Sequence, residues 1–131
     1  MDIDFRKIFF TIAVFAGAWW YVSNHYDLQD AFKWAKTRPV AADREKYVYY
    51  VGMIYYAKDK STEAADVFRE LLTEEATGHY EAKGMMRMGR CLQDLRRFEE
   101  ARGAYERYIE FFPTGPDIEI VKNNYEFIKF R

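Results

Sequence analysis

Two glycines, Gly52 and Gly89, occupy the same place in two copies of one sequence pattern that are offset by 37 residues. The same offset separates Ala64 from Ala101 and Phe68 from Tyr105 in the second half of the pattern. An internal repeat constrains the architecture of a chain more than any other feature of its sequence. Glycine within a helix costs about 1 kcal/mol relative to alanine, so its recurrence indicates a close helix crossing in each copy.

The residues around each glycine follow the i, i+3, i+4, i+7 spacing of one buried helical face. The two apolar stripes are Val48, Val51, Gly52 and Tyr55, and Met85, Met88, Gly89 and Leu92. Turns at residues 58–60 and 95–97 separate each stripe from a second amphipathic run. The pattern predicts two helical hairpins, and an ordinary helical hairpin bundle is the alternative to a repeat array.

The repeated pattern resembles the tetratricopeptide repeat, a helix–turn–helix unit of about 34 residues with a W-x2-L-G-x2-Y…A-x3-F…P signature. The resemblance covers two units, at roughly 45–78 and 82–115. The small residues of the signature are retained, whereas Val48 and Met85 replace its tryptophan and only the second unit has its proline, Pro113. The resemblance implies an all-α fold: a short α-solenoid of two repeats, closed by a capping helix at roughly 117–130.

The N-terminal part has no charged residue between Lys7 and Asp27. As a helix, residues 8–26 would extend about 28 Å, close to the roughly 30 Å hydrocarbon core of a bilayer. The flanking residues suit the two membrane interfaces, with Arg6 and Lys7 at one end and Trp19, Trp20 and Tyr21 at the other. We therefore expect residues 1–26 to form a transmembrane signal anchor that contacts lipid through residues 8–26. A signal peptide cleaved near residues 16–18 and a buried soluble helix are the alternatives.

The rest of the chain divides into a juxtamembrane helix and linker, residues 27–43, and the repeat domain, residues 44–131. Because Arg6 and Lys7 favour a cytoplasmic N-terminus, they place the repeat domain on the outer side of the membrane, periplasmic or equivalent. Basic residues on the other flank, Lys33, Lys36 and Arg38, oppose this single-pass orientation.

The sequence offers little that could support catalysis. It has two histidines and one cysteine, Cys91, and the spacings of zinc sites, phosphate-binding loops and nucleophile elbows do not occur in it. A formal net charge of −1 disfavours nucleic acid as the main partner. We expect no enzyme, no cofactor or metal and no small-molecule substrate, and we expect Cys91 to be a buried structural thiol.

The family resemblance implies that the first helix of each unit lines a groove for protein partners. The candidate groove residues are Tyr49, Met53 and Tyr56 in the first unit, and Lys83, Met86, Arg87, Arg90 and Gln93 in the second. The aromatic and methionine side chains fit inter-repeat core equally well, and the basic stripe is either a solvated face or a site for an acidic segment or a chain-terminal carboxylate. The expected function is a membrane-anchored protein–protein interaction module, an accessory or scaffold subunit of a larger membrane complex. A chaperone-like or quality-control factor of a membrane translocation or assembly machinery is the alternative.

Overall fold

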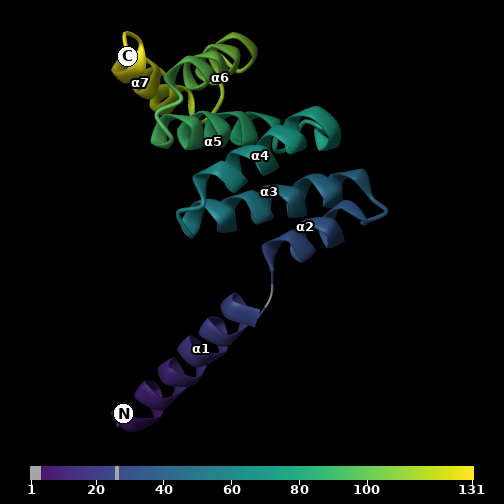
Figure 1. Ribbon diagram of the computed structural model, residues 1–131, viewed down its shortest axis with the longest axis vertical. Helices are drawn as coiled ribbons and strands as arrows, with labels where there is room; N and C mark the ends of the chain where they lie inside the picture. The colour runs from purple at the N-terminus through teal and green to yellow at the C-terminus, as the bar shows by residue number, and fades with distance from the viewer. Residues whose placement is uncertain (1–3, 26) are drawn as a thin grey trace.

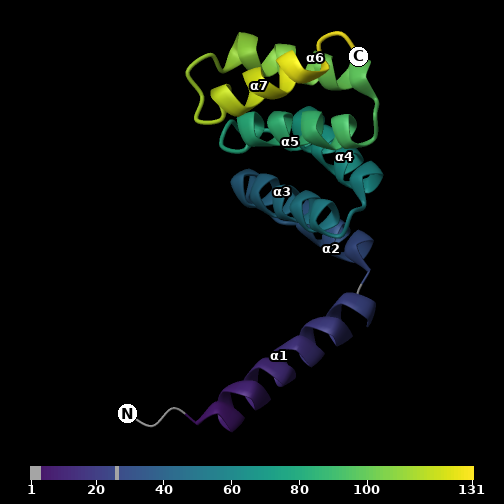
Figure 2. The same ribbon diagram turned by 90° about the vertical axis from the view of Figure 1, so that its left-hand side faces the viewer.

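The computed structural model describes residues 4–25 and 27–131, and every regular element within these ranges is helical (Figure 1). The elements are α1 (Phe5–His25), α2 (Leu28–Lys36), α3 (Ala41–Ala57), α4 (Ser61–Glu70) with a π-helical turn at Leu71–Glu75, α5 (Glu81–Asp94), α6 (Phe98–Phe111) and α7 (Ile118–Ile128). Helices α2 to α7 stack in chain order, each against the next (Figures 1 and 2). The prediction of an all-α fold is confirmed.

The two repeated glycines lie where the helices of each hairpin cross. A Cβ atom added to Gly52 in α3 would lie 2.6 Å from the ring of Phe68 in α4. The same addition to Gly89 in α5 would lie 2.6 Å from the ring of Tyr105 in α6. Both rings are fully buried, so the hairpins require glycine because an aromatic side chain rests directly on the helix backbone.

The turns within the two hairpins have the same backbone geometry. Asp59 and Arg96, which are 37 residues apart, both adopt left-handed conformations, with φ of 59° and 60°. The next residue in each turn donates a backbone hydrogen bond to a carbonyl five residues earlier, from Lys60 to Tyr55 at 3.0 Å and from Arg97 to Leu92 at 2.9 Å. These bonds satisfy carbonyls that the helix end would otherwise leave unpaired.

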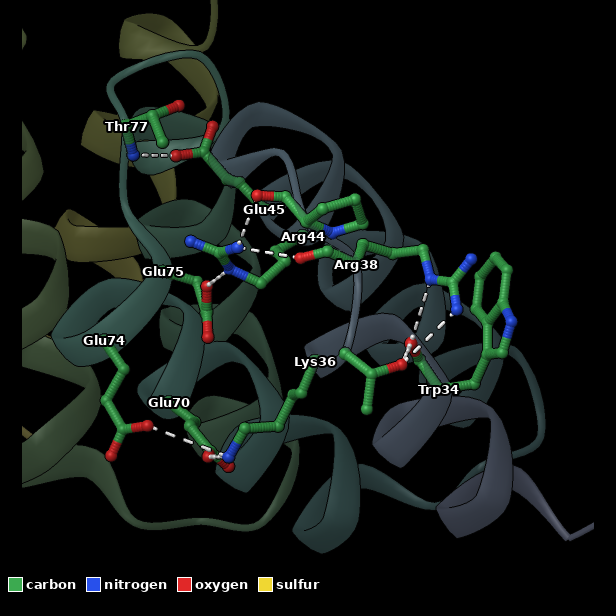
Figure 3. A network of polar contacts seen from close by, with 11 residues as sticks. Trp34, Lys36, Arg38, Arg44, Glu45, Glu70, Glu74, Glu75 and Thr77 are labelled. Carbon is green, nitrogen blue, oxygen red and sulfur yellow. Dashed lines mark hydrogen bonds and ion pairs between the residues drawn. The ribbon is translucent and has the colours of Figure 1, made fainter.

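The junction between the hairpins is fixed by a buried carboxylate. Glu45 in α3 is fully buried, and its side chain accepts a hydrogen bond from the backbone N–H group of Thr77 (Figure 3). It accepts a second one from the backbone N–H group of Tyr80 at 2.6 Å. Tyr80 precedes α5, where a negative charge interacts favourably with the helix dipole. Gly78, with φ of 106°, allows the extra residues of this junction to turn. The junction accounts for a repeat longer than the 34 residues of the signature.

Polar contacts hold α2 against the first hairpin. Lys36 of α2 pairs with Glu70 and with Glu74, the latter at 3.7 Å. Arg44 of α3 pairs with Glu75 at 3.1 Å and also donates a hydrogen bond at 2.7 Å to the carbonyl oxygen of Arg38, which follows α2 (Figure 3). Beneath these contacts, Ala35 is fully buried in the core. Helix α2 therefore packs on α3, as α4 packs on α5. It takes the place that the second helix of a preceding hairpin would occupy.

Helix α7 closes the other end of the stack. Val121 and Ile128 are fully buried where α7 packs against α6, while Lys122, Glu126 and Lys129 are exposed. The terminal element of a repeat array usually has a polar outer face, and α7 has one only in part because Ile120 and Phe127 are exposed as well. This helix lies within the range predicted for the capping helix.

Helix α1 extends away from the stack (Figures 1 and 2). In the parts of the chain that the structure describes, no helix combines the length and the apolarity needed to cross a membrane. The transmembrane helix predicted for residues 8–26 is therefore not found, and its last residue lies outside the described ranges. Helix α1 has 21 residues, but Trp19, Trp20, Tyr21 and Asn24 make its second half less apolar than its first.

Candidate protein-binding groove

The first helices of the stack lie next to one another and together form a continuous surface. The hydroxyl of Tyr56 in α3 donates a hydrogen bond to Asp94 at the end of α5, at 3.2 Å. A hollow of about 290 Å³ then joins these helices to α7, and its lining includes Tyr56, Arg87, Arg90 and Ile120. Helices α3, α5 and α7 thus contribute side chains to one surface.

The residues of this surface recur at the 37-residue spacing of the repeat. In the sequence, Tyr50, Arg87 and Asn124 are separated by 37 residues each, as are Met53, Arg90 and Phe127. We call the surface around this hollow the first-helix groove and define it by Tyr50, Met53 and Tyr56 of α3, Lys83, Arg87 and Arg90 of α5, and Ile120, Asn124 and Phe127 of α7. The residues from α3 and α7 are aromatic, apolar or amide side chains and those from α5 are basic, while Asp117, just before α7, also lines the hollow.

The arginines at the centre of the groove differ in their surroundings. The Nε atom of Arg90 lies 3.6 Å from a carboxylate oxygen of Asp94, which partly compensates its charge. Arg87 has neither an ion pair nor a hydrogen bond among residues 4–25 and 27–131. The Nε atoms of Arg87 and Arg90 are both buried without a hydrogen-bond partner, and Asp117 lines the same hollow. A buried polar atom without a partner carries an unrecovered desolvation cost. Both arginines therefore carry an Nε atom whose hydrogen-bonding capacity is unused, and neither atom is accessible from outside the protein.

Tyr56 closes one side of the hollow with a hydroxyl group that stays protonated. Burial raises the pKa of Tyr56 above its ordinary value, and the nearby carboxylate of Asp94 raises it further. The phenol is consequently a hydrogen-bond donor at neutral pH, and it donates to the carboxylate of Asp94.

The structure separates the residues predicted for the groove into two sets. Met53, Tyr56, Lys83, Arg87 and Arg90 lie on the first-helix groove and are partly or fully exposed. The other three support the core: Tyr49 is 8 % and Met86 7 % exposed, although Met86 also lines the hollow beside Tyr56 and Arg87, and Gln93 accepts a hydrogen bond from the hydroxyl of Tyr105 at 2.7 Å.

Sequence reasoning missed Tyr50 and the contribution of α7. Ile120 and Phe127 are 52 % and 61 % exposed, and Asn124 lies beside Arg87 in the lining of the hollow. The 37-residue spacing would have found them if it had been extended by one more period, from Arg87 to Asn124. A third period is difficult to recognise in the sequence because Glu126 occupies the position 37 residues after Gly89, where a third glycine would be expected.

The predicted membrane-interface residues all lie on α1. Arg6, Lys7, Trp19, Trp20 and Tyr21 are exposed there, at the ends where the sequence places them. The two tryptophans are 68 % and 66 % exposed. Near its C-terminal end, α1 meets the stack at an apolar hollow of about 300 Å³, whose lining includes Trp19, Val22, Leu28, Ala31 and Ile54.

The side chains that could hold a metal ion or act as a thiol nucleophile can be located in the described residues. No group of three or more metal-ligating side chains is found within residues 4–25 and 27–131. Burial raises the pKa of the Cys91 thiol to about 12, so the thiol stays protonated and is a poor nucleophile at neutral pH. The hollow of the first-helix groove is lined by two arginines, Asp117, Asn124 and apolar and aromatic side chains.

Comparison with known proteins supports the identity of the second hairpin. Residues 83–115, which cover most of α5, all of α6 and the turn after it, match the family model described as Tetratricopeptide repeat. The chain thus contains a tetratricopeptide repeat, and its first hairpin resembles the second in its glycine contact and its turn. No curated protein and no solved structure matches the chain.

Proposed function

We propose that this protein is an accessory or scaffold subunit of a larger membrane-associated protein complex. The observation that carries the proposal is the first-helix groove, which a tetratricopeptide repeat and its neighbours present as one exposed basic and apolar surface. Aromatic residues, methionine and arginine are the side chains enriched in protein interfaces. A repeat of this family indicates a protein–protein interaction module, and the groove is where we place the partner.

The membrane part of the proposal rests on α1. The phenylalanine, isoleucine and tryptophan side chains of this helix are between 47 % and 77 % exposed, on all sides of the helix. Burial of one such side chain is worth about 1.5 to 3 kcal/mol, so α1 gains much by entering an apolar environment. A helix that is apolar on all sides is typical of a membrane or of the interior of a larger assembly.

Native mass spectrometry of the full chain, extracted in a mild detergent, tests the proposed function. We expect the protein to be found with one fixed set of partners at a constant stoichiometry. Many clients at low and variable occupancy would favour the chaperone-like function instead. Recovery of the protein alone would contradict the assignment as a complex subunit.

Flotation with phosphatidylcholine vesicles tests the membrane part separately. The full chain should float with the vesicles, and a variant lacking residues 1–26 should stay in the dense fraction. A matched variant with Phe9→Ser and Phe15→Ser keeps the length of α1 and should float less. If the full chain does not float but keeps its partners, α1 is buried in a protein partner and the lipid assignment is wrong.

A further inference from the structure

We propose that, in water, α1 folds back onto the stack and packs along the seam between α2 and α3, which is lined by Ala31, Trp34, Tyr47 and Ile54. In this closed form α1 and α2 make a further helical hairpin in front of α3. The inference goes beyond the proposed function and stands without it, because it concerns the chain before α1 meets a membrane or a partner.

Helix α1 carries one row of apolar side chains with the spacing of a helix that packs along another helix. The apolar row is Ile8, Ile12, Phe15, Trp19 and Val22, in alternating steps of four and three residues. Such steps keep the side chains on one side of a helix and are typical of packed helix pairs. The five side chains are between 47 % and 72 % exposed, so the stack leaves most of this row open to solvent.

The last two residues of the apolar row already lie against the stack. Trp19 and Val22 line the apolar hollow of about 300 Å³ together with Leu28 and Ala31 of α2 and Ile54 of α3. From this hollow α1 leads away from the stack, while the seam continues along α2 and α3 (Figures 1 and 2). A rotation about the end of α1 would therefore bring the rest of the apolar row onto the seam with the same side of the helix inward.

The seam has apolar surface that its counterpart in the next hairpin does not expose. Trp34 packs on Tyr47 with the ring centroids 5.1 Å apart and is still 48 % exposed, whereas Val67, the seventh residue of α4 as Trp34 is of α2, is 6 % exposed. Ile54 of α3 is 38 % exposed, whereas Cys91, which is 37 residues later in α5, is fully buried. Because α5 follows a complete hairpin and α3 follows α2 alone, the exposed seam marks the place that a preceding helix would cover.

The connection and the helix lengths fit this closure. Two residues separate His25 at the end of α1 from Leu28 at the start of α2, and loops of about two to five residues join antiparallel helices. Asp27 fixes the start of α2, because its side chain accepts a hydrogen bond from the backbone N–H of Gln29 at 3.0 Å. Closed against α2, α1 would run parallel to α3. The apolar row is about 21 Å long and α3 about 25 Å, so the seam can cover the whole row.

The distance between two spin labels, measured by pulsed electron paramagnetic resonance on the full chain in buffer, tests the closure. The labels are attached at Phe9→Cys and Ala42→Cys in a Cys91→Ala background, with an excess of unlabelled protein to suppress distances between molecules. Closure places the label on α1 beside the start of α3, at roughly 10 to 20 Å, since packed helices lie about 8 to 10 Å apart. With α1 extended, about 24 Å of α1 and about 22 Å of α3 separate the labels from the turn and run in different directions, so the distance exceeds about 30 Å.

Two phenylalanines on opposite sides of α1 supply the test variant and its matched control. Phe15 belongs to the apolar row and Phe10 does not, because five residues of helix turn the side chain by about 140°. The two side chains are 72 % and 70 % exposed, so either substitution removes a similar apolar surface from solvent. Phe15→Glu places a charge in the seam and should restore the long distance, whereas Phe10→Glu should keep the short one.

We expect the short distance to predominate in the labelled chain without further substitution. A long distance in that chain, or a short distance that survives Phe15→Glu, would overturn the inference. If the full chain nevertheless floats with phosphatidylcholine vesicles, the membrane part of the proposed function stands and only the closure is wrong.

Discussion

Alanine at two of the three glycines of the second hairpin, Gly89 and Gly103, should have opposite effects on stability. Gly89 lies in α5 beneath the ring of Tyr105, where an added Cβ would be 2.6 Å, 2.9 Å and 3.2 Å from three ring carbons. Gly103 lies within α6 and has no atom within 4 Å of the same added carbon. The two substitutions therefore add the same methyl group to two helices of one hairpin, with and without a clash.

The size of the clash depends on whether Tyr105 can move. Its ring is fully buried and its hydroxyl is held by Gln93 at 2.7 Å, so the ring cannot withdraw without losing that bond. Overpacking of this kind costs about 1 to 3 kcal/mol, and helix propensity returns at most about 1 kcal/mol. Gly89→Ala should therefore lower the free energy of unfolding by about 1 to 2 kcal/mol. Gly103→Ala should raise it by about 0.5 to 1 kcal/mol.

Urea denaturation followed by circular dichroism at 222 nm measures both changes under identical conditions. For a stack of this size, a change of 1 kcal/mol also shifts the thermal midpoint by about 4 to 8 °C, which gives an independent check. If Gly89→Ala is as stable as Gly103→Ala, the ring of Tyr105 does not rest on Gly89. The inference that an aromatic ring packs on the glycine in both hairpins would then be wrong.

Three further predictions follow from the buried polar and thiol groups. Glu45→Ala should lower the free energy of unfolding, measured in urea, by about 1 to 3 kcal/mol because it leaves the N–H groups of Thr77 and Tyr80 without an acceptor. Glu45→Gln should lower it less. A Glu45→Ala variant with an unchanged free energy of unfolding would contradict this role. Cys91 should resist a disulfide-exchange reagent at pH 8 in the native protein and react at once in denaturant, and rapid native reaction would contradict its burial. The folded-state pKa of Cys91 is raised to about 12, so the contribution of this thiol to stability is complete below the unfolded-state pKa of about 8.5. It is lost as pH rises above that value, by at most about 1.4 kcal/mol per pH unit. In the Cys91→Ala variant, the free energy of unfolding should therefore depend less on pH between about pH 8.5 and 10 than in the unmodified protein.

The repeat could be predicted from the sequence because its causes are local. A glycine is needed where Phe68 or Tyr105 rests on a backbone, and its 37-residue recurrence is visible in the chain without any structure. The extra length of the repeat was visible too. Its cause was not, because the buried carboxylate of Glu45 acts on residues that follow it by more than thirty positions.

The groove could be predicted only in part, because exposure depends on neighbours that a helical pattern does not identify. Tyr49 and Met53 lie on one side of α3, yet Tyr49 is covered by Tyr80 at a ring separation of 4.9 Å and Met53 is not. Helix α1 shows a different limit. Its apolar composition indicated an apolar environment, but neither length nor the absence of charge was enough to decide that the helix crosses a bilayer.

Site-specific photo-crosslinking tests the groove as the partner-binding surface most directly. Phe127 of α7 lies on the first-helix groove, and Phe111 at the end of α6 lies on a second helix; the two side chains are 61 % and 64 % exposed. Each phenylalanine is replaced in turn by a photoreactive phenylalanine analogue in the full chain expressed in cells. The groove account predicts one defined protein adduct from position 127 and none of that adduct from position 111. The same adduct from position 111, with none from position 127, would contradict it.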